Sequence, residues 1–364
     1  MLDVVLTLDY EIHGNGQGSP RALMVEPTRR LLDRLDSHGA RLTIMADVGE
    51  ILRFRRHLQE TGRDDFAYGD IAAQLRGAVR TGHDVQLHVH PAYLNATLVG
   101  GKWRLDWSEY DLARLPYPRI DEIVREGKAF LERLLRPVDS SYACVASRSA
   151  NWSMQPSAAL VRALLANGIR VDTSIFKHGR RDGLVRFDYR HAASPLVPWR
   201  VDPRDACRAH PDGELLEFPI YAEARRLPRF VSATRVQRAL AGRRHPVPAG
   251  PPGARAGGVR SRPRPGRLGR AVALAAAHHA WKLDFNQCSG RQLVAGLERA
   301  AARHDRPGRA LPVVLIGHSK LYTPLNERGL ERFLAHVAAH PERFRFATLR
   351  DALARADCFV GDGG

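Results

Sequence analysis

Residues 1–11 read Met-Leu-Asp-Val-Val-Leu-Thr-Leu-Asp-Tyr-Glu. A short, nearly continuous apolar run of this kind is typical of a strand that is buried on both faces, as in a parallel sheet. Asp9 and Glu11 close the run two residues apart, so on an extended chain their carboxylates project to the same side. The sequence therefore predicts that the first strand carries a pair of acids at its carboxyl end.

The same pattern of apolar strand and amphipathic helix recurs along the chain. Between the strands, stretches such as 120–135, 157–166 and 326–339 show the helical spacing of apolar residues, and another helix opens at Pro27. About eight such units predict a distorted (β/α) barrel, with a doubly wound open sheet as the alternative. The predicted strands are 3–8, 41–45, 84–89, 142–146, 170–174, 215–221, 313–317 and 344–347.

Composition narrows the class of protein. The 364 residues are 44% hydrophobic and 26% charged, which suits one large globular domain, and no apolar run approaches the roughly 20 residues that a membrane span needs. The start of the chain lacks the features of a secretory leader, so we expect a cytoplasmic protein. The four cysteines form no Cys-x-x-Cys pair, which argues against a disulfide scaffold or a thiolate zinc site.

The net charge of +17 is concentrated in one segment. Residues 224–283 contain 13 Arg, one Lys and no Asp or Glu, and their middle is rich in Pro, Gly and Arg. We expect a mobile insertion at about 235–280 that interrupts a single domain spanning 1–364. Such a segment suits a solvated loop or a weak contact with anionic lipid or another polyanion. It has no interleaved aromatic residues, so no specific nucleic acid is expected as a partner.

Polar side chains recur where the predicted strands end. The carboxyl ends of barrel strands converge on one mouth, where catalytic groups gather. A His-x-His pair together with a carboxylate suits a divalent cation that keeps an open coordination position, as catalytic zinc does. We therefore expect a metal or acid/base site there. Its candidate residues besides Asp9 and Glu11 are His88, His90, Arg148, Asp172 and His318.

These motifs, in this order, resemble those of the polysaccharide deacetylases of the NodB-homology family. The matching stretches are Leu-Thr-Leu-Asp-Tyr-Glu, Gly-His-Asp-Val-Gln-Leu-His-Val-His-Pro, the segment at Arg148, Asp-Thr-Ser and Leu-Ile-Gly-His. The resemblance covers roughly 1–223 and 284–356. It implies a distorted (β/α) barrel and metal-dependent removal of acetyl groups from a carbohydrate, with Zn²⁺ as the expected ion.

The resemblance also implies a role for each matching residue. Asp9 matches the general base, and Arg148 the residue that orients it. His318 matches the general acid, with Asp172 as its partner. His88 matches the first metal histidine, although the chain departs from the family at two ligand positions. Tyr10 and Ala92 stand where the family has a metal-binding acid and a second histidine, so Glu11 and His90 are the substitutes, with Asp9 as a further possible ligand.

Four other residues are candidates for substrate binding. Trp103 and Trp152 could stack on sugar rings or simply pack in the core. Asp47 and Glu50 could bind substrate hydroxyls, or Asp47 could cap a helix. Two other functions stay open. A barrel glycosidase would use the carboxylates alone, and a non-catalytic glycan- or nucleic-acid-binding protein would have lost its metal.

Overall fold

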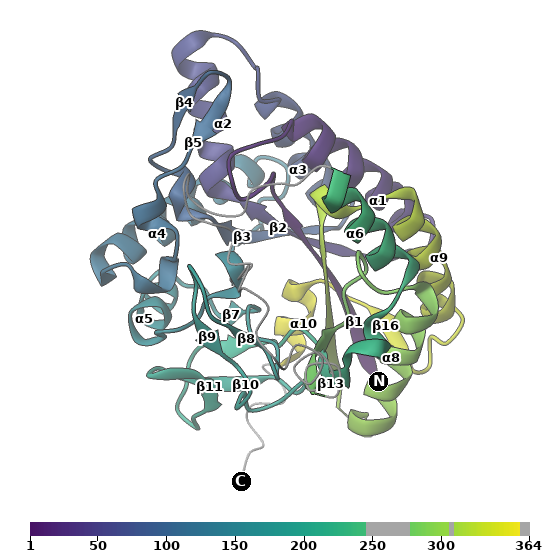
Figure 1. The fold of residues 1–364 in the computed structure, drawn as a ribbon. Helices are drawn as coiled ribbons and strands as arrows, with labels where there is room; N and C mark the ends of the chain where they lie inside the picture. Colours follow the sequence, from purple (N-terminus) through teal and green to yellow (C-terminus); the bar gives the residue numbers. More distant parts are fainter. Residues whose placement is uncertain (245–276, 306–308, 357–364) are drawn as a thin grey trace, which may run out of the picture.

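The computed structural model describes residues 1–244, 277–305 and 309–356. Its centre is a curled sheet of parallel strands in the spatial order β12-β7-β6-β3-β2-β1-β15, surrounded by helices (Figure 1). Ile220, which follows β12 (Leu216–Glu217), bridges to Val314 of β15 (Leu311–His318), and Asp284 bridges to Ile316 of the same strand. The fold is thus the distorted (β/α) barrel that the sequence predicts. The strands of its wall are β1 (Leu2–Tyr10), β2 (Leu42–Asp47), β3 (Asp84–Val89), β6 (Ala146–Ser149), β7 (Val171–Asp172), β12 (Leu216–Glu217) and β15 (Leu311–His318).

The wall strands are almost wholly buried, which explains their apolar sequences. Every residue of β1, β2, β3 and β15 is buried. The helices around them turn one apolar face inward, as with Leu31 and Leu35 of the first. These helices are α1 (Glu26–Asp36), α2 (Val48–Thr61), α3 (Tyr68–Arg80), α4 (Tyr117–Leu135), α5 (Ala158–Ala166), α8 (Gly290–His304), α9 (Pro324–Ala338) and α10 (Leu349–Ala356).

One predicted strand is displaced. The prediction of 142–146 is wrong, because β6 begins at Ala146 and runs to Ser149. The side-chain oxygen Oε1 of Gln86 accepts hydrogen bonds from the backbone N–H groups of Val145 and Ala146, at 2.9 and 2.8 Å. The ladder with β3 therefore starts only at Ser147. As a result Arg148 lies inside the strand rather than after it.

Of the remaining strands, β16 (Phe344–Phe346) matches the predicted strand 344–347, whereas the others form hairpins and an edge that the sequence does not predict. β10 (Trp199–Asp202) and β11 (Asp205–Ala209) extend the sheet beyond β12 as an antiparallel pair, and β16 pairs with β1. Short antiparallel pairs lie in the loops. They are β4 (Thr97–Val99) with β5 (Lys102–Arg104), β8 (Arg180–Arg181) with β9 (Phe187–Asp188), and β13 (Ala222–Arg226) with β14 (His278–Lys282).

The predicted insertion lies partly outside the described residues. At its edges, 233–244 form helix α6 (Ala233–Arg244) and 278–282 form β14, so 235–244 and 278–280 belong to regular structure. Residues 245–276, which hold most of the Pro/Gly/Arg-rich sequence, are not described. No helix in the described part of the chain is long and apolar enough to cross a membrane.

Candidate metal and catalytic site

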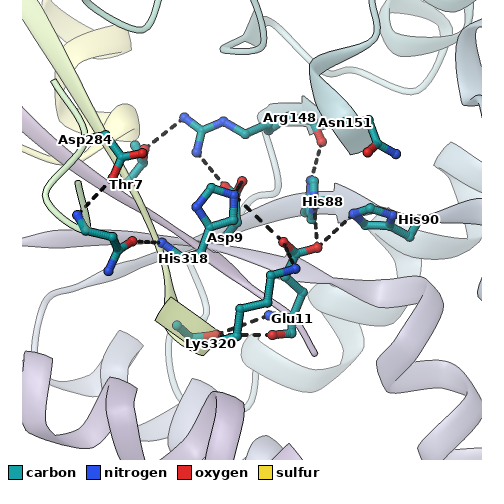
Figure 2. A network of polar contacts seen from close by, with 12 residues as sticks. Thr7, Asp9, Glu11, His88, His90, Arg148, Asn151, Asp284, His318 and Lys320 are labelled. Carbon is teal, nitrogen blue, oxygen red and sulfur yellow. Dashed lines mark hydrogen bonds and ion pairs between the residues drawn. The ribbon is translucent and has the colours of Figure 1, made fainter. Parts of the chain in front are cut away.

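The carboxyl ends of β1, β3, β6 and β15 bring most of the predicted site residues together (Figure 2). Asp9 lies directly opposite His318 in the register of β1 and β15. His88 lies opposite Arg148 in the register of β3 and β6. Tyr10 points to the other face of β1, where its hydroxyl donates to Gln74 Oε1 at 2.8 Å. The alternation expected for an extended strand thus places Asp9 and Glu11 on the mouth side.

Glu11 is the centre of the cluster. Its Oε2 lies 2.8 Å from His90 Nε2 and 3.6 Å from His88 Nε2, while its Oε1 accepts a hydrogen bond from Lys320 Nζ at 2.7 Å. Burial alone would raise the pKa of this carboxyl, but Lys320 and His90 hold it well below its usual range. Glu11 is therefore an ionised carboxylate with one oxygen fixed by a lysine and the other facing two histidines.

The orientation of His88 suits a metal ligand. Its Nδ1–H donates to the backbone oxygen of Arg148 at 2.7 Å, which fixes the ring and leaves Nε2 as the free nitrogen. Metal-binding histidines commonly make such a second hydrogen bond. Within the described residues, His88 Nε2 and Glu11 Oε2 are both buried and without a hydrogen bond of good geometry. Ligand atoms of Glu11, His88 and His90 all lie within 4.8 Å of one another, so these three residues could hold a divalent cation.

Electrostatics also favour a cation at this place. Asp47 and Glu50 lie beside Glu11, and these three carboxylates together with Asp9 are almost fully buried. Among the described residues, the permanent cations in contact with the four acids are Arg148 and Lys320. Burial, and then the charge of Asp47, raise the pKa of Glu50 well above its usual value. Buried carboxylates in excess of cations must take up protons or bind a positive ion.

Asp9 is held by Arg148 as predicted. The guanidinium donates from its NH1 to Asp9 Oδ1 at 2.6 Å, and from its Nε and NH2 to Thr173 O and Thr7 Oγ1. Burial would raise the pKa of Asp9, but Arg148 and then His318 lower it. The other oxygen, Oδ2, lies 3.4 Å from His318 Nε2. Asp9 is thus ionised at neutral pH, with one oxygen turned toward a histidine.

The structure does not place Asp172 against His318. Asp172 accepts from the backbone N–H and hydroxyl of Ser174 and from the Ser147 hydroxyl, and it lies beside Glu217. Its pKa is raised by burial, and that of Glu217 is raised by burial and then by Asp172, so these carboxyls form their own buried pair. Meanwhile His318 Nδ1 has no hydrogen-bond partner among the described residues. The predicted Asp172–His318 partnership is therefore wrong.

The protonation of His318 also differs from that of a general acid, which carries its proton before the reaction starts. Burial lowers its pKa, and Asp9 and Glu11 oppose this shift only in part. We therefore describe His318 as neutral at neutral pH rather than as a permanent imidazolium. Its backbone N–H donates to Asn286 Oδ1 at 2.5 Å, which fixes the end of β15 beside the loop that follows Asp284.

Asp47, the last residue of β2, and Glu50, in the first turn of α2, both accept hydrogen bonds from backbone N–H groups. Asp47 Oδ1 accepts the backbone N–H of Gly49 at 3.0 Å and so caps α2, and it also accepts the N–H of His90 at 3.0 Å. Glu50 Oε2 accepts the N–H of Ile12 at 2.8 Å. Both side chains are fully buried beneath Glu11. They therefore position His90 and the segment after β1, rather than facing an open mouth.

The two candidate tryptophans occupy different surroundings. Trp103 is buried in a cluster with Phe54 and Phe66, which is a packing role. Trp152 is half-buried, with its ring centroid 5.9 Å from that of His318. The structure thus brings Trp152, but not Trp103, into contact with the predicted catalytic histidine.

Three side chains at the site lie outside the sequence prediction. Lys320 contacts Glu11, while Asp284 and Lys282 lie on the segment that bridges to β15. Lys320 follows His318 by two positions, and Lys282 precedes Asp284 by two. Lys320 lies in the 3-10 turn Ser319–Leu321 that follows β15, so the alternation of a strand does not indicate it. Asp284 follows no predicted strand and looks like a loop acid in the sequence, but it is fully buried and accepts from the backbone N–H of Asn286.

The fold and the site together define a (β/α)-barrel protein with a buried Glu–His–His cluster suited to a divalent cation. The sequence matches no protein-family model and no curated protein. Among solved structures, the chain is similar to a protein of Mycobacterium smegmatis assigned as a polysaccharide deacetylase, at 17% identity and a TM-score of 0.46 over 98% of this chain and 91% of that one.

Other similar structures carry different activities. A family 4 acetyl xylan esterase from Clostridium thermocellum, solved with a cobalt ion, is 11% identical, with a TM-score of 0.40 over 96% of this chain and 90% of that one. A GH57-type branching enzyme from Pyrococcus horikoshii is 13% identical, with a TM-score of 0.49 over 97% and 70% of the two chains. Such distant likenesses carry no functional information, so function is inferred from this chain's own side chains.

Proposed function

We propose that this protein is a metal-dependent hydrolase that removes acetyl groups from an acetylated sugar or polysaccharide. The observation that carries the proposal is the position of Glu11, His88 and His90 directly beside the Asp9–Arg148 pair and His318 (Figure 2). A group of cation ligands next to an ionised carboxylate and a histidine is what hydrolysis of an amide or ester requires. The resemblance of the sequence motifs to polysaccharide deacetylases points to the same chemistry.

The proposed cofactor is a divalent cation, with Zn²⁺ the expected ion, held by Glu11 Oε2, His88 Nε2 and His90. When bound, such a cation lowers the pKa of a water molecule to about 7 and polarises a carbonyl oxygen. Lys320 holds the second oxygen of Glu11 and so fixes the orientation of this ligand. Asp9 is close enough to belong to the same group, since ligand atoms of Asp9, Glu11 and His318 also lie within 4.8 Å of one another.

The chain's own residues would move the protons. Asp9 accepts a proton from the attacking water at Oδ2, while Arg148 keeps the other oxygen fixed and favours the ionised form before attack. His318 Nε2, 3.4 Å from Asp9 Oδ2, can receive a proton from that carboxyl and deliver it to the departing nitrogen. The products are acetate and a free amine, or an alcohol where the substrate is an ester.

Acetate release measured together with new reducing ends tests this function. The Zn²⁺-loaded protein is incubated with a panel of N- and O-acetylated sugars and oligosaccharides, and we expect acetate without new reducing ends. Asp9→Asn should keep the fold and the metal but lose about 10²- to 10⁴-fold in turnover, the usual contribution of one proton transfer. Reducing ends without acetate would instead show a barrel glycosidase. Glycan binding with neither product would show a binding protein.

A further inference from the structure

Lys282 is a cation at the barrel mouth that has no acidic partner in the described part of the chain. It ends β14, and its Nζ lies 3.5 Å from the ring centroid of Trp152 and 4.4 Å from that of Phe176. Within the described residues the Lys282 ammonium forms no hydrogen bond and no ion pair within 4 Å. The nearby acids Asp9 and Asp284 attract it, but both already have other partners, Arg148 for Asp9 and the Asn286 N–H for Asp284.

A half-buried ammonium without a counter-ion is unfavourable. Burial lowers the pKa of Lys282 to about 8, and the two nearby acids oppose this shift only in part. Two aromatic faces compensate some of the lost hydration, since a cation over a ring is attracted by the negative face of the π system. They cannot satisfy the three N–H donors of the ammonium group, which still need oxygen acceptors.

Trp152, one of the two aromatic residues that contact Lys282, belongs to a defined turn at the mouth. Asn151 and Trp152 both adopt left-handed backbone conformations, with φ of 55° and 60°, which are rare for a bulky residue. The hydroxyl of Tyr189 donates to the backbone oxygen of Trp152 and accepts the N–H of Met154, so it fixes this turn. The Trp152 ring consequently contacts both Lys282 and His318.

The other residue of the turn contacts a second cation. Figure 2 shows Asn151 on the His90 side of the cluster, and its Oδ1 accepts from Arg181 NH1 at 3.1 Å. Arg181 has no ion pair among the described residues, and the amide Nδ2 of Asn151 is buried without a hydrogen-bond partner there. Among the described residues, the turn therefore carries two buried side-chain donors without a partner, Asn151 Nδ2 and Trp152 Nε1.

We propose that the substrate carries an anionic group, a carboxylate or a phosphate, and that Lys282 binds it beside the reacting acetyl group. This proposal rests on the proposed function, which it deepens by naming the substrate class as an acidic acetylated sugar. The anion supplies the oxygen acceptors that the Lys282 ammonium lacks, while the sugar ring packs against Trp152. Arg181 and the Asn151 amide are further donors for the same substrate.

Equilibrium binding tests the proposal without depending on turnover. The full-length chain, Zn²⁺-loaded and carrying Asp9→Asn to prevent hydrolysis, is titrated calorimetrically with three probes. These are N-acetylglucosamine, the same sugar oxidised to a carboxylate at C6, and its 1-phosphate, so the two anionic probes separate the carboxylate from the phosphate source. We expect at least one of them to bind about tenfold or more tightly than the neutral sugar, since a charge-assisted hydrogen bond contributes that much.

Lys282→Met keeps the aliphatic stem on Trp152 but removes the charge. It should abolish the preference for the anionic probe while leaving the affinity for the neutral sugar within about twofold. Lys282→Arg should restore most of the preference, and Lys102→Met, at an exposed lysine of β5, should leave it unchanged. Equal affinity for all three probes, or an equal loss on all three in Lys282→Met, would overturn the proposal even if acetate release is confirmed. A retained preference without acetate release would instead refute only the proposed hydrolysis.

Discussion

In the proposed hydrolysis, Asp9 and His318 are neighbouring side chains that share the proton transfer. Arg148 favours the ionised form of Asp9, whereas burial favours the neutral form of His318. Both groups can therefore accept a proton before the reaction starts, and their Oδ2 and Nε2 atoms lie 3.4 Å apart. In that proposal Asp9 starts the reaction as base, and His318 finishes it as acid only after it receives a proton.

If the two residues share the proton transfer in this way, His318→Gln should lower turnover by different factors on two kinds of substrate. Turnover of an N-acetyl sugar should fall by about 10² or more, because an amine leaves only when it is protonated. Turnover of an activated aryl acetate should fall much less, since its leaving group needs little protonation. Steady-state kinetics on both substrates provide the measurement, and His336→Ala, at a histidine of α9, is the matched control. Equal losses on both substrates would count against His318 as the acid.

At the scale of the elements, β3 carries a titratable side chain near each of its two ends. Its carboxyl end carries His88 at the mouth, whereas its first residue, Asp84, is buried at the opposite end of the strand. Burial raises the pKa of Asp84 to about 6, although Arg350, 3.2 Å away, and the Gln86 side chain favour its ionised form. The strand therefore contains a carboxyl whose titration affects stability but not the site.

The sign of that effect follows from proton linkage. Between about pH 4 and pH 6 the folded chain holds a proton on Asp84 that the unfolded chain has released, so this group stabilises the fold less as pH rises through that window. Relative to Asp84→Asn, the wild type should lose up to about 3 kcal/mol of unfolding free energy between pH 4 and pH 7. Urea unfolding of both proteins at several pH values measures the difference. A difference independent of pH would show that Asp84 is not perturbed.

The elements also show what sequence can and cannot predict. The long wall strands β1, β3 and β15 are predictable because both of their faces are buried, which leaves a continuous apolar run. The start of β6 is not, because its register depends on Gln86, a side chain of a neighbouring strand. The short hairpins, such as β8 with β9, are not predictable either, because their strands have too few residues to show an alternation of apolar and polar side chains.

Some residues of the candidate site are likewise predictable from the sequence, and others are not. Strand alternation is enough to bring Asp9 and Glu11 to one face, and the structure adds their contacts with Arg148 and His90. The predicted partnership of Asp172 is wrong because two buried carboxyls in neighbouring strands pair with each other, which depends on the register of β7 and β12. Lys282 reaches the site only through the closure of the barrel around β15, which no local pattern encodes.

At the scale of the whole molecule, the excess of positive charge lies in a segment of the sequence separate from the site residues. Six of the arginines lie between residues 245 and 276, without any Asp or Glu. Replacing this segment by a Gly/Ser sequence of equal length should leave the melting temperature and the turnover of soluble substrates close to wild type, because the number of residues between α6 and β14, which sets the closure entropy, is unchanged. Binding to vesicles containing anionic lipid should weaken, and its dependence on salt should flatten.

Co-sedimentation with vesicles at several salt concentrations measures this effect, with neutral vesicles as the control. Unchanged binding to anionic vesicles would leave the segment without the proposed partner. A large fall in melting temperature would show that the segment contributes to the packing of the barrel.

The most direct test of the account is the metal content of the protein. Equilibrium dialysis against Zn²⁺ followed by elemental analysis should give one tightly bound ion per chain in the wild type. His88→Ala, His90→Ala and Glu11→Gln should each lose that ion while they keep the fold, and His336→Ala should retain it. A wild-type chain that binds no divalent cation, or a His90→Ala chain that keeps full occupancy, would contradict the Glu11–His88–His90 centre on which the proposed function depends.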